Sequence, residues 1–89
     1  MSERSDLDGA GNVRIEFTVE PFVDGHPGDH VLAAWRAVEA SGRQLENGPF
    51  SASTEVPDDE VGDLVSAVVT AALGEGATRV ALQVERMAP

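Results

Sequence analysis

Hydrophobic and polar residues alternate strictly along the stretch VRIEFTVE, residues 13–20. The apolar side chains occupy every second position: Val13, Ile15, Phe17 and Val19. Because successive side chains of a strand point to opposite faces, this pattern predicts a strand with one buried and one polar face. Pro21 is expected to end the strand, since proline has no amide hydrogen to donate to a sheet.

Two later segments carry the spacing of amphipathic helices. In DHVLAAWRAVEASG the apolar stripe consists of Val31, Ala34, Trp35 and Val38. Gly42 is expected to end this helix in a left-handed conformation. In PDDEVGDLVSAVVTAALGEG the stripe consists of Val61, Leu64, Val65, Val68 and Ala72. Pro57 and three acidic residues at its start suit the positive end of a helix dipole, and Gly74 and Gly76 are expected to end it.

The remaining segments predict three more strands. Asn47-Gly48 lies between two short extended runs and predicts a two-residue hairpin turn, in which both residues take positive φ. After the turn, one face is shared by Phe50, Ala52, Thr54 and Val56. The last strand, TRVALQVE, is expected to turn Val80, Leu82 and Val84 inward.

The predicted order is therefore β-α-β-β-α-β. This order is typical of a ferredoxin-like α+β sandwich, in which a four-stranded antiparallel sheet carries two helices on one face. Residues 13–89 are predicted to form a single ferredoxin-like domain. Residues 1–12 lack periodicity and are predicted to be a flexible N-terminal tail.

The charge and composition of the chain limit the classes of molecule that it is expected to bind. With 16 acidic and 6 basic residues, the chain has a net charge of −10, which repels nucleic acid phosphates and anionic lipid headgroups. We therefore expect no nucleic acid or membrane partner, and a charged ligand should be a cation. The 89 residues include no cysteine, no signal-like segment and no apolar run of about 20 residues, so we expect a cytoplasmic protein.

Motifs for catalysis or metal binding are weak. The loop PFVDGHPGDH holds His26 and His30, but Pro27 and Gly28 separate them, and no third ligand is indicated. Asp29 or Gly28 is expected to cap the following helix, which would leave both histidines exposed. Without a nucleophile motif or a phosphate-binding glycine loop, we expect no enzyme activity, no catalytic residue, no metal and no cofactor.

The face of the sheet opposite the helices is predicted to be polar and acidic. Its side chains are expected to be Arg14, Glu16, Thr18, Glu20, Ser51, Ser53, Glu55, Ala81, Gln83 and Glu85. Two interpretations remain open: a solvated face or dimer contact, and a site for a small cation held by carboxylates and hydroxyls. Trp35 and Phe50 are aromatic residues that either fill the core or stack on such a ligand.

Several short motifs also follow one another in a recognisable order. They are IEFTVEP, ASG, GPFS, TE, DDEV and EGATRV, at residues 15–21, 40–42, 48–51, 54–55, 58–61 and 75–80. Together they resemble the thiamine-binding YkoF-like family of small domains, over about Val13 to Glu85. The resemblance implies a ferredoxin-like fold, association as dimers or tetramers and, for some members, binding of thiamine or related pyrimidines.

Residue by residue, the resemblance implies that Glu16 is the glutamate of the first strand in the family motif. Thr18 and Pro21 are then the threonine and proline that follow it, and Glu55 is the later glutamate. The family threonine of the third strand falls on Ala52, and the glycine after the second glutamate falls on Val56. The predicted ligand-binding residues are Glu16, Thr18, Phe50, Ser53 and Glu55.

Two functions follow as the leading hypotheses, and metal binding through His26 and His30 ranks third. The first is non-enzymatic binding of thiamine or a thiamine-like cation by a homo-oligomer, with the pocket either on the open sheet face or between sheet and helices. The second is a self-associating regulatory module without a small ligand, whose contact surface would include Glu16 or Glu55.

Overall fold

The computed structural model describes residues 12–48 and 51–87, which contain four strands and two long helices. The elements are β1 (Asn12–Glu20), α1 (Asp29–Ala40), β2 (Glu46–Asn47), β3 (Ala52–Pro57), α2 (Val61–Gly74) and β4 (Arg79–Arg86). One turn of 3-10 helix, Asp58–Glu60, leads from β3 into α2. The predicted β-α-β-β-α-β order of a ferredoxin-like α+β fold is confirmed. β1 begins at Asn12, and the rest of the predicted tail lies outside the described residues.

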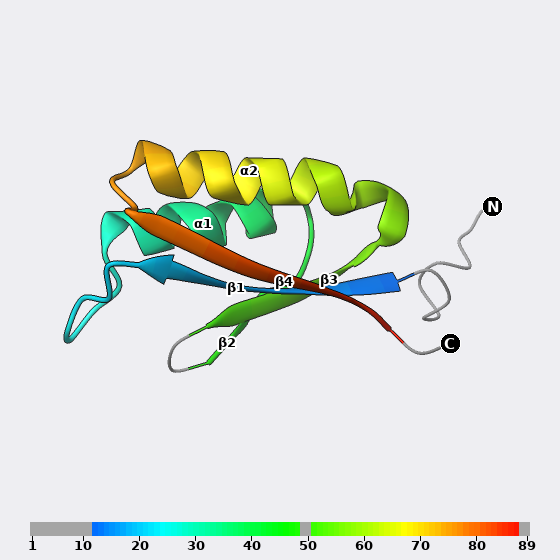
Figure 1. Ribbon diagram of the computed structural model, residues 1–89, viewed down its shortest axis with the longest axis horizontal. Coiled ribbons are helices and arrows are strands. Elements are labelled where there is room, and N and C mark those ends of the chain that lie inside the picture. The colour runs from blue at the N-terminus through cyan, green and yellow to red at the C-terminus, as the bar shows by residue number, and fades with distance from the viewer. Residues whose placement is uncertain (1–11, 49–50, 88–89) are drawn as a thin grey trace.

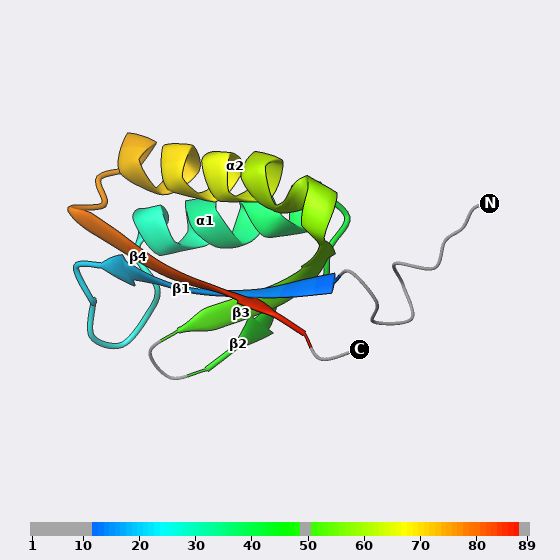
Figure 2. The ribbon, with the colours of Figure 1, turned by 45° about the vertical axis from the view of Figure 1, so that its right-hand side comes forward.

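The four strands form one antiparallel sheet in the order β2-β3-β1-β4. β1 lies in the middle and pairs with β3 on one side and with β4 on the other. Both helices cover the same face of the sheet and pack against each other (Figure 1, Figure 2). No helix or strand of the described residues covers the opposite face of the sheet, and β2 and β4 are its two edges.

The core lies between β1 and the two helices. Ile15 and Phe17 keep only 1% and 2% of their surface exposed, whereas Glu16 between them points to the open face and is half-buried. The helices add a second buried set: Ala34, Val38, Leu64, Val68 and Ala72. Burial of one large apolar side chain stabilises a fold by roughly 1.5–3 kcal/mol. The alternation in β1 therefore determines which face of the sheet the helices cover.

The predicted ends of the helices are largely confirmed. Gly42 has a φ of 83°, which is the left-handed conformation expected after α1. α2 ends at Gly74, and the acidic residues expected at its start form the 3-10 turn that precedes it. No helix in the two described segments is long and apolar enough to cross a bilayer.

The hairpin turn between β2 and β3 is not where the sequence predicted it. Asn47 belongs to β2 and pairs with Ala52, and neither Asn47 nor Gly48 has a positive φ. The amide of Gly48 donates to the carbonyl oxygen of Ser51 at 2.7 Å, so the ladder continues past the predicted turn. The predicted turn residues therefore belong to the β2–β3 ladder, and the connection between the two strands lies outside the described residues. The prediction failed because register with β3, not local turn propensity, sets where the hairpin closes.

The inward face of β4 is also less buried than predicted. Val80 and Leu82 are half-buried and pack against the core, but Val84 is 53% exposed. β4 is an edge strand and makes few contacts with α2. Alternation identified the helix-facing side of β4 correctly, but it carried no information on how far the helices extend over that side.

Candidate functional site

A cavity of about 440 Å³ lies where β1 ends, and we call it the end pocket. It is bounded by the end of β1, the loop of residues 21–28, the first turns of α1 and the β2–β3 turn. Its volume falls within the range of roughly 300–1,000 Å³ that is common for small-molecule sites. The end pocket lies between the sheet and the helix layer at one end of the molecule.

Apolar and aromatic side chains form most of the wall of the end pocket. Phe17 is part of the core, Trp35 and Val31 are half-buried on α1, and Val23 in the loop is 44% exposed. The sequence left Trp35 open between a core and a stacking role. In the structure Trp35 packs against the core and also lines the end pocket.

The polar groups of the end pocket come from the loop and the sheet. Asp24 and His26 are exposed loop residues, whereas Thr18 and Ser51 bring hydroxyl groups from β1 and from the residue before β3. A carboxylate beside aromatic rings is a suitable environment for a flat cation, because charge and ring faces both favour it. The sequence analysis did not select Asp24, since nothing local indicated that the loop borders a cavity.

The loop is held by His30, and here the prediction of an exposed histidine was wrong. His30 is only 7% exposed, and its Nε2 atom lies 2.6 Å from the carbonyl oxygen of Pro21. Because a carbonyl oxygen only accepts hydrogen bonds, Nε2 is the nitrogen that donates. The loop folds back over the start of α1 and covers the ring, which the sequence pattern does not show.

Gly28 completes this arrangement. Its carbonyl oxygen accepts hydrogen bonds from the amides of Val31 and Leu32, each at 3.0 Å, so Gly28 is the residue that caps α1. A Cβ atom at this position would lie only 2.6 Å from Cε1 of His30. Glycine is therefore needed here for close approach to the His30 ring.

The two histidines are not arranged as a metal pair. His26 is exposed in the loop, and His30 is bound to Pro21. Within residues 12–48 and 51–87, no group of three or more histidine, aspartate or glutamate side chains is placed to hold a metal ion.

A second hollow, of about 390 Å³, lies on the open face of the sheet, and we call it the face hollow. It is lined by Glu16, Thr18, Ser51, Ala81 and Gln83, among others. The Oγ atom of Ser51 donates to Oε2 of Glu16 at 3.0 Å, and Nη1 of Arg14 lies 3.6 Å from Oε1. Thr18 and Ser51 line both the face hollow and the end pocket, so the two cavities adjoin.

The predicted ligand-binding residues are divided between separate regions. Glu16 and Thr18 meet in the face hollow, and Thr18 also reaches the end pocket. Ser53 is buried opposite Glu16, and Glu55 is exposed opposite Arg14, and both line a third hollow toward the other end of β1. Phe50 lies outside the described residues. Ser51, which the sequence placed on the polar face but not in the site, is the direct partner of Glu16.

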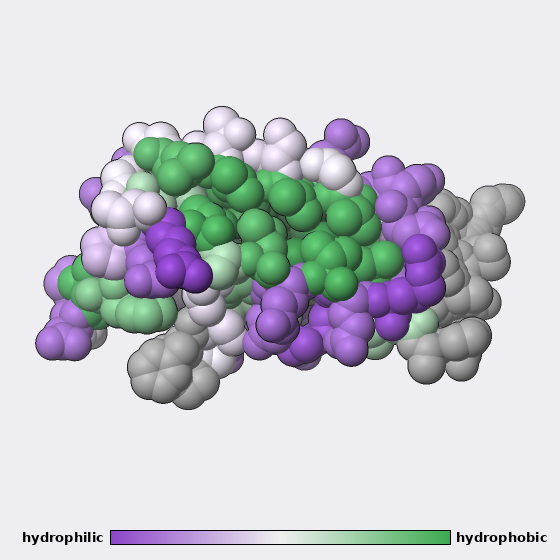
Figure 3. Space-filling model, in the orientation of Figure 1, coloured by the Kyte–Doolittle hydropathy of each residue, from purple (hydrophilic) through white to green (hydrophobic). Residues whose placement is uncertain are grey.

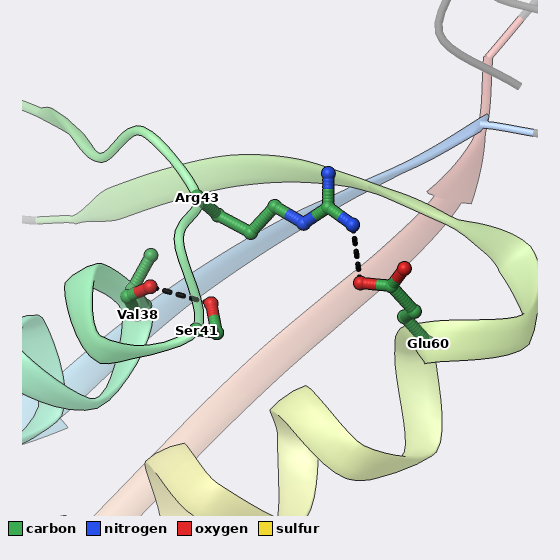
Figure 4. A network of polar contacts seen from close by, with 4 residues as sticks. All are labelled: Val38, Ser41, Arg43 and Glu60. Carbon is green, nitrogen blue, oxygen red and sulfur yellow. Dashed lines mark hydrogen bonds and ion pairs between the residues drawn. The ribbon is translucent and has the colours of Figure 1, made fainter. Parts of the chain in front are cut away.

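The third hollow, of about 320 Å³, adjoins a structural contact between the helices. Arg43, which follows α1, donates from Nη2 to Oε1 of Glu60 just before α2 (Figure 4). Ser41 donates to the carbonyl oxygen of Val38 at 2.5 Å and helps to end α1. Arg43 is thus engaged in joining the two helix ends, and the third hollow lacks the aromatic wall of the end pocket.

Two solved structures resemble this chain in fold and in sequence. A domain of unknown function, DUF77, from Bacillus cereus is 25% identical and has a TM-score of 0.61, over 83% of this chain and 72% of that chain. A candidate thiamine biosynthesis/salvage protein from Thermotoga maritima is 27% identical and also has a TM-score of 0.61, over 83% of this chain and 80% of that chain.

A third structure, the aspartate kinase of Clostridium acetobutylicum, is 13% identical with a TM-score of 0.52 over 83% of this chain and 18% of that chain, and it shares the fold alone. No protein-family model and no curated protein sequence matches this chain. The chain is therefore similar, across most of its length, to a structure whose name refers to thiamine biosynthesis or salvage.

Proposed function

We propose that this protein is related to the YkoF-like thiamine-binding proteins and binds thiamine or a thiamine-like cation without catalysing a reaction. The observation that carries the proposal is the likeness in fold and sequence to the thiamine-named protein of Thermotoga maritima. The end pocket gives this likeness a physical basis, because it combines aromatic walls with a carboxylate.

The chemistry of thiamine matches the end pocket. Thiamine joins a positively charged thiazolium ring to an aminopyrimidine ring, so it offers two flat faces and one charge. Trp35 and Phe22 supply apolar ring surface, and Asp24 supplies a negative charge at the rim. The hydroxyl group of Thr18 is available to hydrogen-bond a ring nitrogen or the amino group, whereas that of Ser51 donates to Glu16 and can only accept from the amino group. The net charge of −10 adds a general attraction for cations.

We expect binding alone because the titratable groups of the end pocket are open to water. Asp24 and His26 are both exposed. General acids and bases usually act in sites from which water is excluded, where the environment adjusts their protonation. The pocket is therefore better suited to hold a ligand than to transform it.

Thermal unfolding in the presence of thiamine tests the proposal. A ligand at a hundredfold excess over its dissociation constant stabilises the folded state by about 2.7 kcal/mol. For a domain of this size, that corresponds to an increase in Tm of roughly 10–20 °C. Choline, a cation without rings, and the uncharged hydroxymethylpyrimidine half of thiamine serve as controls, and each should shift Tm less. An unchanged Tm at millimolar thiamine would contradict the proposal.

A further inference from the structure

The edge strand β4 is long, and within residues 12–48 and 51–87 no strand pairs with its outer side. It runs over eight residues, Arg79–Arg86, and its central segment Val80–Val84 carries no charge and no proline. The other edge, β2, has only two residues. Long edges without charge or proline readily pair with a strand of another chain, because their outer amides and carbonyls lack partners within the sheet.

An apolar surface continues from β4 onto α2. Beside the buried row of α2 runs a second row, spaced by four residues, whose members are half-buried or exposed: Val61, Val65, Val69 and Leu73. Leu73 and Val84 are 52% and 53% exposed. Figure 3 shows the apolar side chains of α2 and β4 as one continuous area on the side of the molecule that carries the β4 edge. Exposed apolar areas of this kind are typical of protein–protein contacts.

The backbone of β4 presents its free hydrogen-bonding groups at defined positions. Met87 donates its amide to the carbonyl oxygen of Asn12 at 3.0 Å, in step with the β1–β4 register. In an antiparallel ladder, the residues that bond to one neighbour alternate. Val80, Leu82 and Val84 therefore turn their amide and carbonyl groups away from β1, toward the free edge. These are also the residues whose side chains lie on the helix side.

We infer that β4 pairs antiparallel with β4 of a second copy of this chain, about a twofold axis at Leu82. In this register, Leu82 lies opposite Leu82 of the partner subunit, and Val80 lies opposite Val84 of the partner subunit. Val80, Leu82 and Val84 then form hydrogen-bonded pairs and extend the apolar surface across the contact.

The charged residues near the ends of β4 favour the register with the axis at Leu82. On the open face, it places Arg79 opposite Glu85 of the partner subunit, and the twofold axis repeats that pair. Moving the axis to Gln83 would separate these charges and would place Val80 opposite Arg86 of the partner subunit. Opposite charges on facing positions stabilise a strand pair, so the axis at Leu82 is favoured. The two sheets become one continuous sheet, with all helices on the same face.

The contact is a dimer interface that does not depend on the proposed ligand. The sequence hypothesis of a contact at Glu16 or Glu55 concerns the open face, whereas this contact uses the β4 edge and the flank of α2. Assays of self-association can therefore be made without ligand. Failure of the dimer would leave the thiamine proposal intact, and the reverse is also true.

Single cysteines test the register, because the chain has no cysteine of its own. In the proposed dimer the two Leu82 Cα atoms lie about 5.5 Å apart, within the range that a disulfide spans. The two Val84 positions lie about 13 Å or more apart, since four residues of strand separate them. Under mild oxidation, L82C should form a covalent dimer and V84C should remain largely monomeric in denaturing gels. Equal cross-linking of both variants, or none of L82C, would overturn the register.

Sedimentation of the full chain and of charge variants tests the contact itself. R79E and E85R should each weaken the dimer about tenfold, because like charges then face each other twice, and the double variant R79E/E85R should restore it. V84K should also dissociate the dimer, whereas V23K, the same change at an exposed valine of the loop, should not. A wild-type chain that stays monomeric from micromolar to millimolar concentration would overturn the inference. So would a double variant as weak as the single ones.

Discussion

The Nε2 atom of His30 lies 2.6 Å from the carbonyl oxygen of Pro21, so the two ends of the pocket loop are joined by one hydrogen bond. The start of the same loop is tied to the residue before β4, because the carbonyl oxygen of Glu20 accepts from the amide of Thr78 at 2.8 Å. The loop that carries Asp24 and His26 is therefore fixed at its base, while its tip stays exposed. The shape of the end pocket depends on these few contacts.

Replacing His30 should destabilise the protein. H30L removes the donor and leaves the Pro21 carbonyl without its partner, which should lower the free energy of unfolding by about 1–3 kcal/mol. H30Q, whose amide nitrogen reaches a position close to that of Nε2, should retain a larger part of the stability. H26L, the same change at the exposed histidine, should stay within about 0.5 kcal/mol of wild type. Urea unfolding followed by circular dichroism measures all three, and an H30L protein as stable as wild type would refute the role given to His30.

Two glycine-to-alanine changes should have opposite signs. G28A places a Cβ atom 2.6 Å from Cε1 of His30, and that ring is held by its hydrogen bond, so stability should fall by about 1–3 kcal/mol. G62A adds a Cβ atom in α2 with nothing within 4 Å, so it should raise stability by about 0.5–1 kcal/mol through helix propensity. The two midpoints of chemical unfolding should therefore move in opposite directions. Similar shifts for both variants would show that the close approach at Gly28 is unimportant.

Asp24 should contribute to cation binding. D24N removes a carboxylate at the rim of the end pocket and should weaken thiamine binding about tenfold, which corresponds to about 1.4 kcal/mol. D59N makes the same change in net charge in the 3-10 turn at the opposite end of the molecule (Figure 1), and its affinity should equal that of wild type. Titration calorimetry at constant ionic strength compares them. Equal losses in both variants would indicate that only overall charge matters.

Substitution of Glu16 tests which of the two adjoining cavities holds the ligand. If the ligand occupies the end pocket, E16Q should reduce affinity less than D24N does, because Glu16 lines the face hollow and already bonds to Ser51. S51A removes a hydroxyl group from a residue that lines both cavities, so it should change the affinity for thiamine whichever cavity holds the ligand. The same calorimetric titrations give the ranking. A loss in E16Q larger than in D24N would move the site to the open face.

The contact between Arg43 and Glu60 should couple the two helix ends weakly. Both side chains are partly exposed, at 23% and 44%, so a double-mutant cycle with R43M and E60Q should give a coupling of about 0.2–1 kcal/mol. The coupling should shrink in 1 M salt, where charges are screened within about 3 Å. Unfolding free energies of the four proteins at low and high salt provide the measurement. A coupling that is unchanged by salt would argue for packing of the arginine stem as its source.

Local patterns were sufficient for the fold. Alternation from Val13 to Val19 and the helical stripes around Val38 and Val68 are properties of single segments, because side-chain direction repeats with the backbone geometry of each element. These segments have few ways to bury their apolar faces. Packing two helices on one face of a four-stranded sheet buries all of these faces. The buried apolar positions of β1 and of both helices followed from these patterns, whereas the burial of His30 did not.

The site depends on contacts between segments distant in sequence, which no local pattern encodes. Strand register sets Glu16 opposite Ser53 and Arg14 opposite Glu55, and it thereby places the two predicted glutamates in different hollows. The path of the loop buries His30 and places Asp24 in the wall of the same pocket as Trp35. Periodicity in the sequence thus determined which face of each element is apolar. The packing of whole elements against one another determined which polar side chains meet, because strand register and loop path are set by long-range packing.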